Sequence, residues 1–512
     1  MISLLTLALV LGTASAGVSE GFACLREADL ACAVGERDAA LKDDPDATET
    51  RQLVAMTYFY EGRYTEAAAL AKALEDQGAK LAFDAPIQET AEATKGFLRA
   101  RGRGVEVRYA RGLDIVLVEE AIETLEKARQ TIDPLLGGGP DHTIVVDIFP
   151  DGKSFIASSG LPEEAVRTTG VVALSKWTRL LVTSPRALSR GYAWKDTVVH
   201  EYIHLVVAWR TRDRCPVWLQ EGLAKHLEGW WRGETTGHLS AYQQSLLAGA
   251  VHTGGFVPFE KFKHSMAYLD SGEEAALAFS QVATMVAYLL TLRGPEALPG
   301  VLDAVREGED AGQAVSSSAG FSSFEAFREG WINFVRGLPL VSEQLSSLPV
   351  VLDGSGTEYA DDPLLSARTD LARYARLGDL LREQDRCRAA LVEYTKADDP
   401  QAPPSPSLLA RKAECYGKLG DRDQALTLVT RGVQLYPEFT LLQTTYASLL
   451  ESAGRTGEAQ RAWLAAHDLN PFNPAVQAAI VRTSDALGDK TQSERHKRYA
   501  QLLMTGGMGE GR

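Results

Sequence analysis

Residues 196–209 have the sequence DTVVHEYIHLVVAW, which contains the most informative motif of the chain. It contains His200 and His204, which lie four residues apart and share one face of a helix, so both imidazoles can bind one metal ion. Glu201 follows the first histidine and can face a water molecule at that ion. The expected helix has an apolar body made of Val198, Val199, Ile203, Val206 and Val207.

A second helix is expected in PVWLQEGLAKHLE, residues 216–228. Glu221 on this helix can approach the first helix closely, because Gly222 after it removes side-chain bulk. A catalytic zinc ion takes three protein ligands and leaves one position for water. The two segments therefore predict one Zn²⁺ per chain, held by His200, His204 and Glu221. Taken alone, the first motif has an alternative: two histidines on an apolar helix, one bonded to the backbone and one exposed.

These segments resemble the gluzincin type of zinc metallopeptidase, and specifically its bacterial peptidase MA-like branch, which is often fused to tetratricopeptide repeats. The resemblance rests on HEYIHLVV (200–207) and PVWLQEGLAKHLEG (216–229), and it extends to GVVALSKWTRLLVTSPRAL (170–188). It covers about residues 105–335. It implies an α+β, zincin-like domain, in which a twisted sheet lies over the active-site helix and a helical subdomain follows.

The resemblance also implies roles for the residues. His200 and His204 would be zinc ligands, Glu221 the third ligand, and Glu201 the general base that takes a proton from water and returns it to the leaving amine. In the resembling fold an edge strand pairs with extended substrate. Our candidate for that strand is Arg179, Leu180, Leu181, Val182 and Thr183, and the alternative is an ordinary hairpin.

Supporting residues around the metal are less well defined. Gln220 is a candidate to hydrogen-bond a ligand histidine, with a solvated helix position as the alternative. Gluzincins often carry an acidic residue four positions after the ligand glutamate, but this chain has Lys225 there, so Asp196 or Glu228 would have to substitute. The candidates to stabilise an oxyanion are Tyr268, Tyr288 and His264.

The chain outside this region shows a helical repeat. Gly420, Gly454 and Gly488 are spaced by 34 residues, as are Pro437 and Pro471. This period resembles that of tetratricopeptide (TPR) repeats. We expect a signal peptide at 1–16, a TPR-like helical segment at 17–102, the metallopeptidase domain at 103–340, a linker at 341–367, a TPR array at 368–506 and a flexible tail at 507–512.

Composition and the N-terminus bear on location and partners. The net charge of −15, with no long basic run, argues against nucleic acid as a partner. A short apolar run precedes Ala14-Ser15-Ala16, which has the form of a signal-peptidase site, so we expect an extracytoplasmic protein, periplasmic or secreted, with no membrane span after cleavage. Export permits disulfides. Cys24 and Cys32 can form a disulfide only if a turn separates them. Cys387 and Cys415 can form one if neighbouring helices bring them together. The alternative is that all five cysteines are buried thiols.

The function expected from the sequence is an exported zinc metallopeptidase whose TPR repeats bind a substrate or a partner protein. One rival is a non-enzymatic TPR scaffold with an inert or structural zinc domain. The intact Glu201 argues against this rival, because a structural site needs no base. A second rival is a zinc hydrolase that acts on cell-wall amides.

Overall fold

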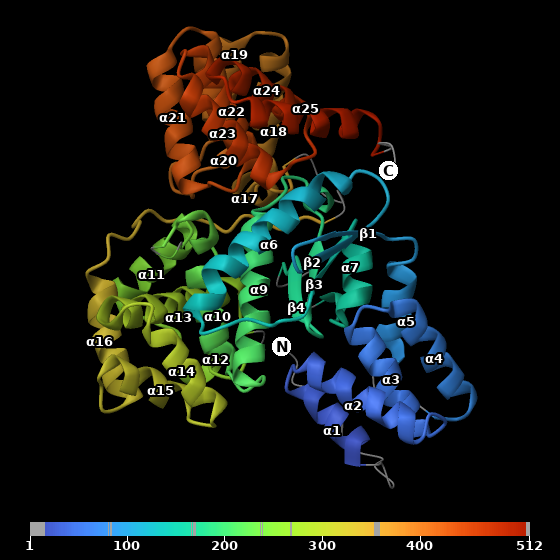
Figure 1. The fold of residues 1–512 in the computed structure, drawn as a ribbon. Helices are drawn as coiled ribbons and strands as arrows, with labels where there is room; N and C mark the ends of the chain where they lie inside the picture. Colours follow the sequence, from blue (N-terminus) through green and yellow to red (C-terminus); the bar gives the residue numbers. More distant parts are fainter. Residues whose placement is uncertain are drawn as a thin grey trace.

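The computed structural model describes residues 16–507, except 80, 82–83, 165, 167–169, 236, 238, 267–268 and 353–358. The chain is mostly helical with one small mixed sheet (Figure 1). The expected signal peptide and C-terminal tail fall outside the described residues, apart from Ala16 and Gly507.

Helices α1 to α5 form the N-terminal part. Their bounds are Ala16–Arg26, Leu30–Asp43, Thr48–Tyr60, Tyr64–Asp76 and Asp84–Ala93. Cys24 of α1 and Cys32 of α2 form a disulfide across the turn between the helices. Cys215, Cys387 and Cys415 are buried free thiols. The segment expected to be helical as far as residue 102 becomes a strand at its end, where Leu98–Gly102 forms β1. This part of the prediction was wrong because Leu98–Gly102 pairs antiparallel with β2 and forms a hairpin with it across a short turn.

The sheet has five strands in the order β1-β2-β3-β5-β4. The other strands are β2 (Val105–Tyr109), β3 (Ile144–Phe149), β4 (Ala173–Lys176) and β5 (Arg179–Thr183). The pairs β2–β3 and β3–β5 are parallel, and β4–β5 is antiparallel. Trp177 and Thr178 adopt positive φ in the tight turn between β4 and β5. The sheet therefore ends at β4 on one side and at β1 on the other.

The substrate strand predicted at Arg179–Thr183 is not an edge strand. It is β5, which lies between β3 and β4 and is buried along its whole length. A strand with neighbours on both sides has no backbone groups left for an extended peptide. The edge on this side is β4, so the prediction was wrong by one strand of the hairpin.

Three helices pack against the sheet. α6 (Ile115–Leu135) contacts β2, α7 (Gly152–Ser159) contacts β3 and β5, and α9 (Trp194–Thr211) contacts β4 and β5. α7 begins at Asp151, whose side chain accepts a hydrogen bond from the Ser154 N–H, as is typical of a helix N-cap. α9 also packs on α6, so the segment from His200 to His204 lies between the sheet and the helices (Figure 1).

A helical subdomain follows α9. It contains α10 to α16, with bounds Val217–Leu227, Ala241–Thr253, Phe259–Phe262, Gly272–Arg293, Ala297–Arg306, Ala311–Ala319 and Phe324–Arg336. Within the described part of the chain, α13 alone is long and apolar enough to cross a membrane by length and composition, and half of that stretch is buried in the protein. It packs against α10, α11, α15 and α16, as expected for the central helix of a globular subdomain.

The C-terminal array is built of helix pairs. Its helices are α18 to α25, with bounds Thr369–Glu383, Cys387–Lys396, Pro406–Lys418, Arg422–Leu435, Thr440–Ser452, Thr456–Leu469, Pro474–Leu487 and Lys490–Met504. Gly420, Gly454 and Gly488 adopt positive φ in the turns within three of the pairs, which explains their 34-residue spacing. In the first pair, Asp385 occupies this left-handed position. The expected linker holds one short helix, α17 (Pro363–Ala367), which starts at Pro363 after the N-cap Asp362.

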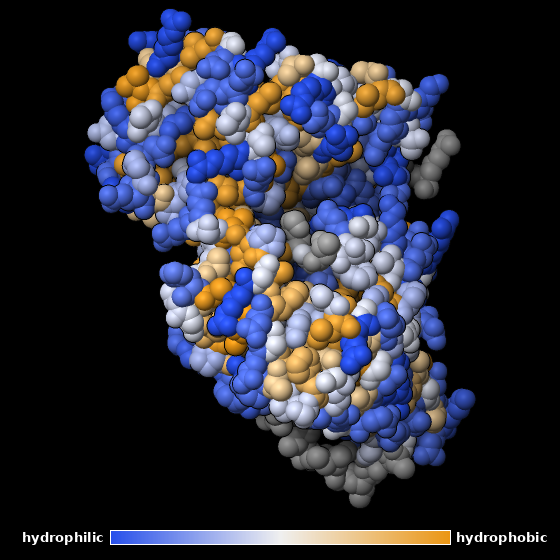
Figure 2. Space-filling view, turned by 90° about the vertical axis from the view of Figure 1, so that its left-hand side faces the viewer, coloured by the Kyte–Doolittle hydropathy of each residue, from blue (hydrophilic) through white to orange (hydrophobic). Residues whose placement is uncertain are grey.

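The array and the sheet-containing part form two lobes that touch (Figures 1 and 2). α25 packs on α6, and α23 packs on α9. Apolar residues are scattered over both lobes among hydrophilic ones on the face that Figure 2 shows. α9, which carries His200 and His204, is therefore in contact with the repeats as well as with the sheet.

Candidate metal centre

Two helices bring the predicted metal-binding residues together. His200 and His204 lie one turn apart on α9, and their rings are 4.8 Å apart between centroids. Glu221 lies on α10, which packs against α9. Gly222 does allow close packing, although against α13: a Cβ at this position would lie 2.8 Å from the Val282 carbonyl oxygen. The carboxylate of Glu221 therefore faces the two imidazoles.

Three donor atoms form a nearly equilateral triangle. Nε2 of His200 and Nε2 of His204 are 3.2 Å apart, and Oε2 of Glu221 lies 3.4 Å and 3.3 Å from them. A tetrahedral zinc ion with bonds of roughly 2.0–2.1 Å has ligand atoms about 3.3–3.4 Å apart. The geometry of this donor set therefore fits a tetrahedral divalent ion, with one face of the tetrahedron supplied by the protein.

The three side chains are also open to solvent on one side. The exposed fractions of the side chains are 17 % for His200, 14 % for His204 and 21 % for Glu221. A closed structural site would bury its ligands and complete its coordination with protein atoms. The partial exposure leaves room for a fourth, non-protein ligand.

Glu201 lies beside this group without belonging to the triangle. Its side chain is buried, and Oε2 accepts a hydrogen bond of 2.5 Å from the Ser175 backbone N–H. Burial raises its pKa, and the positive charges of His204 and His200 act against that rise. Ser175 belongs to β4, so the carboxylate is fixed to the edge strand of the sheet. This contact could not be predicted from the sequence, because it joins a strand and a helix through a backbone atom.

Glu228 contacts the ring nitrogen of His200 that lies outside the triangle of donor atoms. Its Oε2 lies 2.9 Å from Nδ1 of His200, and its other oxygen pairs with Nζ of Lys225 at 2.5 Å. A carboxylate on the second ring nitrogen fixes the tautomer and the orientation of a metal-binding histidine. Glu228 follows Glu221 by seven residues, two helical turns, and so lies on the same side of α10. Lys225, which stands at the position expected to be acidic, holds this carboxylate instead.

The charges of the cluster are mutually dependent. Burial alone would lower the pKa of His200, but hydrogen bonds to Glu221 and Glu228 outweigh it and raise the pKa to about 10. Burial would raise the pKa of Glu221, but the nearby His204 and His200 hold it well below its usual range. The pKa of Glu228 is also lowered against the effect of burial, by Lys225 and His200. Three carboxylates gathered around two imidazoles thus favour a cation between them.

Two predicted supporting residues have other partners. The Gln220 side chain donates to the Cys215 carbonyl oxygen at 2.8 Å and stabilises the start of α10, so the predicted bond to a ligand histidine was wrong. Asp196 accepts from Nε1 of Trp231 at 2.9 Å and pairs with Arg232 at 2.7 Å. Asp196 and Glu228 were the two carboxylates expected to replace the acidic residue absent at position 225. Glu228 is the one that contacts His200.

Neither of the two predicted oxyanion residues that the structure describes contacts the cluster. Tyr288 lies on α13 among the rings of Phe321, Phe327 and Phe334, with centroid distances of 5.2–6.2 Å. The prediction for Tyr288 was wrong because aromatic packing in the helical subdomain holds its ring there. His264 is exposed on the loop after α12. Tyr268 lies outside the described residues.

One comparison with known proteins matches the part of the chain that contains the candidate metal centre. Residues 153–337, less than half of the chain, match the Peptidase MA superfamily. A search of curated proteins gave no match.

Solved structures show weak similarity over larger parts of the chain. Leukotriene A4 hydrolase from Saccharomyces cerevisiae is 13 % identical, with a TM-score of 0.33, over 80 % of this chain and 67 % of that one. A crystal structure of MamA is 12 % identical, with a TM-score of 0.23, over 28 % of this chain and 82 % of that one. The APC/C hetero-tetramer Cut9–Hcn1 is 11 % identical, with a TM-score of 0.25, over 95 % of this chain and 78 % of the other. At these TM-scores the similarities carry no argument.

Proposed function

We propose that this protein is a zinc-dependent metallopeptidase of the gluzincin type, with a zincin-like catalytic domain. The observation that carries the proposal is the triangle of His200, His204 and Glu221 donor atoms, with sides of 3.2–3.4 Å. The Peptidase MA superfamily match over 153–337 supports it. Bound at this triangle, zinc acidifies a water molecule and polarises a carbonyl group.

The chain's own residues then have distinct roles. His200, His204 and Glu221 hold the ion, and Glu228 orients the His200 ring through Nδ1. Glu201 accepts the proton of the attacking water and later donates it to the leaving amine. Its backbone partner, Ser175 N–H, keeps the carboxylate at a fixed place beside the ion.

Edge strand β4 is the proposed binding site for an extended peptide. Because the N–H of Ser175 points to Glu201, the backbone groups of this residue face away from β5. Backbone direction alternates along an antiparallel strand, so Ala173 faces outward as well. A peptide that adds to this edge by β-augmentation would lie next to Glu201 and the metal group.

The repeat array is the proposed binding surface for a protein substrate or partner. A groove of about 400 Å³ lies between α20 and α22 and is lined by small and polar side chains that include Glu414, Lys418, Thr444 and Ser448. Export from the cytoplasm is also part of the proposal. The Cys24–Cys32 disulfide supports it, because such bonds persist in oxidising compartments.

The test is the isosteric change Glu201→Gln. It keeps the size of the side chain and removes the base, so zinc should still bind at one ion per chain while peptide hydrolysis falls by about 10²–10⁴-fold. The measurements are zinc content and cleavage of a denatured proteome, with a peptidoglycan digest in parallel. The matched control is Glu260→Gln, an exposed glutamate on α12.

Each other outcome identifies a rival. Cleavage of peptidoglycan alone would indicate a cell-wall amide hydrolase. Zinc binding with no cleavage of any substrate by wild-type protein would indicate a scaffold with a structural metal. Wild-type protein that binds no zinc would remove the basis of the proposal.

A further inference from the structure

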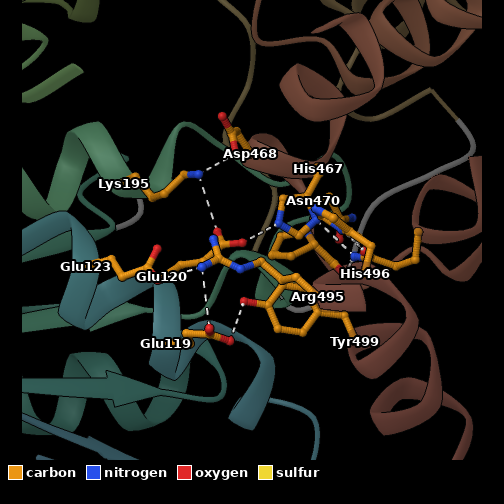
Figure 3. Close-up of polar contacts among 12 residues, drawn as sticks. Glu119, Glu120, Glu123, Lys195, His467, Asp468, Asn470, Arg495, His496 and Tyr499 are labelled. Carbon is orange, nitrogen blue, oxygen red and sulfur yellow. Dashed lines mark hydrogen bonds and ion pairs between the residues drawn. The ribbon is translucent and has the colours of Figure 1, made fainter. Parts of the chain in front are cut away.

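A second group of metal-ligand side chains lies where the two lobes meet. Glu120 of α6 and His467 and Asp468 of α23 place ligand atoms within 4.8 Å of one another. Figure 3 shows that Lys195 of α9 points into the same group. Its Nζ lies 3.3 Å from Oε2 of Glu120 and also pairs with Asp468. An ammonium group at the centre repels a metal ion, so this group is an ion-pair network.

Both ring nitrogens of His467 have polar partners in this network. Nε2 of His467 lies 2.7 Å from Oε1 of Glu120, and its Nδ1 lies 2.9 Å from the side-chain nitrogen of Gln477. Gln477 also lies 2.6 Å from Nδ1 of His496 on α25. Glu120, His467, Gln477 and His496 are buried, Lys195 is partly exposed and Asp468 is half-exposed. The network thus joins α6 and α9 to the last helices of the array.

Backbone contacts fix the segment immediately before α9 to the array. Tyr192 N–H donates to the Leu469 carbonyl oxygen at 3.0 Å, at the C-terminus of α23. Gly191 approaches so closely, at φ 70°, that a Cβ would lie 2.1 Å from the same oxygen. The Thr440 hydroxyl at the start of α22 donates to the Arg190 carbonyl oxygen. Residues 190–195 are therefore held at several points by repeat helices.

A separate set of ion pairs fixes α6 to α25. Arg495 lies 3.4 Å from Glu119 and 2.6 Å from Glu123, and Arg498 lies 2.7 Å from Glu119 (Figure 3 shows Arg495 and both glutamates). α6 in turn packs on α9. The array thus contacts α9 directly and also through its neighbour.

The contacts between the array and α9 lie close to the metal group along the helix. Lys195 is the second residue of α9 and precedes His200 by five residues on one rigid helix. Tyr192 is buried, and its hydroxyl donates to the Thr183 carbonyl oxygen at the end of β5. Burial raises the pKa of Tyr192, and the negative charge of Glu201 adds to this rise.

We propose that the repeat array is a structural part of the metal centre, in which Lys195 with Asp468, and Gly191 with Leu469, position the N-terminal end of α9. We call these four residues the clamp. The inference rests on the proposed function for its effect on zinc and catalysis, and it adds a role for the array besides binding other proteins. Lys195 and Asp468 are positioning residues, since they act on the metal group through α9.

Two variants of the full-length protein test the clamp independently. Asp468→Asn removes the charge that faces Lys195 at a half-exposed position, so the fold should tolerate it. Gly191→Ala forces the loop away from Leu469 through its new Cβ. The matched controls are Glu343→Gln, which breaks an exposed ion pair with Arg431, and Gly454→Ala, which replaces a positive-φ glycine that has no neighbour near its Cβ.

The first readout is amide hydrogen exchange in residues 194–204, measured without zinc. We expect exchange to rise about threefold in Asp468→Asn and about tenfold in Gly191→Ala, and to remain at the wild-type rate in both controls. The second readout is zinc affinity by competition with a chelator, which should fall severalfold in the same order. With a cleaved substrate, kcat should fall while KM stays nearly constant, because the peptide-binding strand is not part of the clamp.

The outcomes separate this inference from the proposed function. Wild-type exchange and wild-type zinc affinity in both folded variants would overturn the clamp. If wild-type protein binds no zinc, the proposed function fails, yet the exchange measurement still decides whether the array positions α9. If Gly191→Ala does not fold, Asp468→Asn alone decides, because an unchanged exchange rate in this variant also overturns the clamp.

Discussion

Nδ1 of His200 lies 2.9 Å from Oε2 of Glu228, so the ring that offers Nε2 to the metal group is held on its other side by a carboxylate. We predict that Glu228→Gln weakens zinc binding about 10–100-fold, the usual effect of removing such a partner. Competition with a chelating dye measures the affinity. Glu234→Gln, half-exposed and paired with Arg232, is the control. Unchanged affinity in Glu228→Gln would show that His200 needs no support from this residue.

Metal removal should lower thermal stability through the same residues. Zinc that binds only the folded protein stabilises it by about 2.7 kcal/mol at a hundredfold excess over Kd. We expect the Tm of wild-type protein to rise on zinc addition and to fall with chelator, and we expect neither change in Glu221→Ala. Differential scanning calorimetry checks this, with His252→Gln, an exposed histidine on α11, as the control. A wild-type response in Glu221→Ala would mean that zinc binds elsewhere.

A proline substitution tests whether an extended peptide binds to edge strand β4. Ala173→Pro removes an outward N–H from the strand and leaves the Ser175 contact with Glu201 in place. We expect kcat/KM for extended peptides to fall about tenfold, mainly through KM, which corresponds to one lost hydrogen bond of roughly 1–1.5 kcal/mol. Steady-state kinetics on one peptide gives both constants. Ser175→Ala keeps the backbone donor and should behave like wild type. Equal losses in both variants would argue against peptide pairing at β4.

The pH dependence of stability should report on His226. Burial lowers the pKa of this histidine to about 4, whereas in the unfolded chain it is about 6.5. Its contribution to stability is complete above pH 6.5 and is lost as the pH falls towards 4, because the unfolded state then binds the proton first. In chelator, His226→Gln should flatten the slope of unfolding free energy by up to about 1.4 kcal/mol per pH unit in this window. Urea unfolding at several pH values measures it, and an unchanged slope would contradict the burial argument.

The sequence was sufficient to predict that the side chains of His200, His204 and Glu221 lie together, because their positions depend on local geometry. His200 and His204 are one helical turn apart, and the spacing alone places both on one face. Glu221 required only that the next helix fold back. The period of Gly420, Gly454 and Gly488 likewise reflects a turn within each helix pair.

The misassigned residues all depend on contacts that the sequence pattern does not specify. Arg179–Thr183 is buried at every position, the pattern of an interior strand, while its hairpin partner β4 is the edge. Gln220 bonds a nearby carbonyl group in place of a histidine, and Tyr288 fits an aromatic cluster that Phe321 and two rings of α16 build. The role of Glu228 could have been predicted from its spacing of seven residues after Glu221. Lys195 and Asp468 could not, since 273 residues separate them.

That separation sets an order of events during synthesis. At about 5–20 residues per second, a ribosome needs roughly 14–55 s to proceed from Lys195 to Asp468. Throughout this interval the histidine-bearing helix has Glu120 as a partner of Lys195 but lacks its partners in the repeat array. A nascent or prematurely terminated chain would therefore carry an incompletely assembled metal centre, and hydrolytic competence would come only when translation is nearly finished.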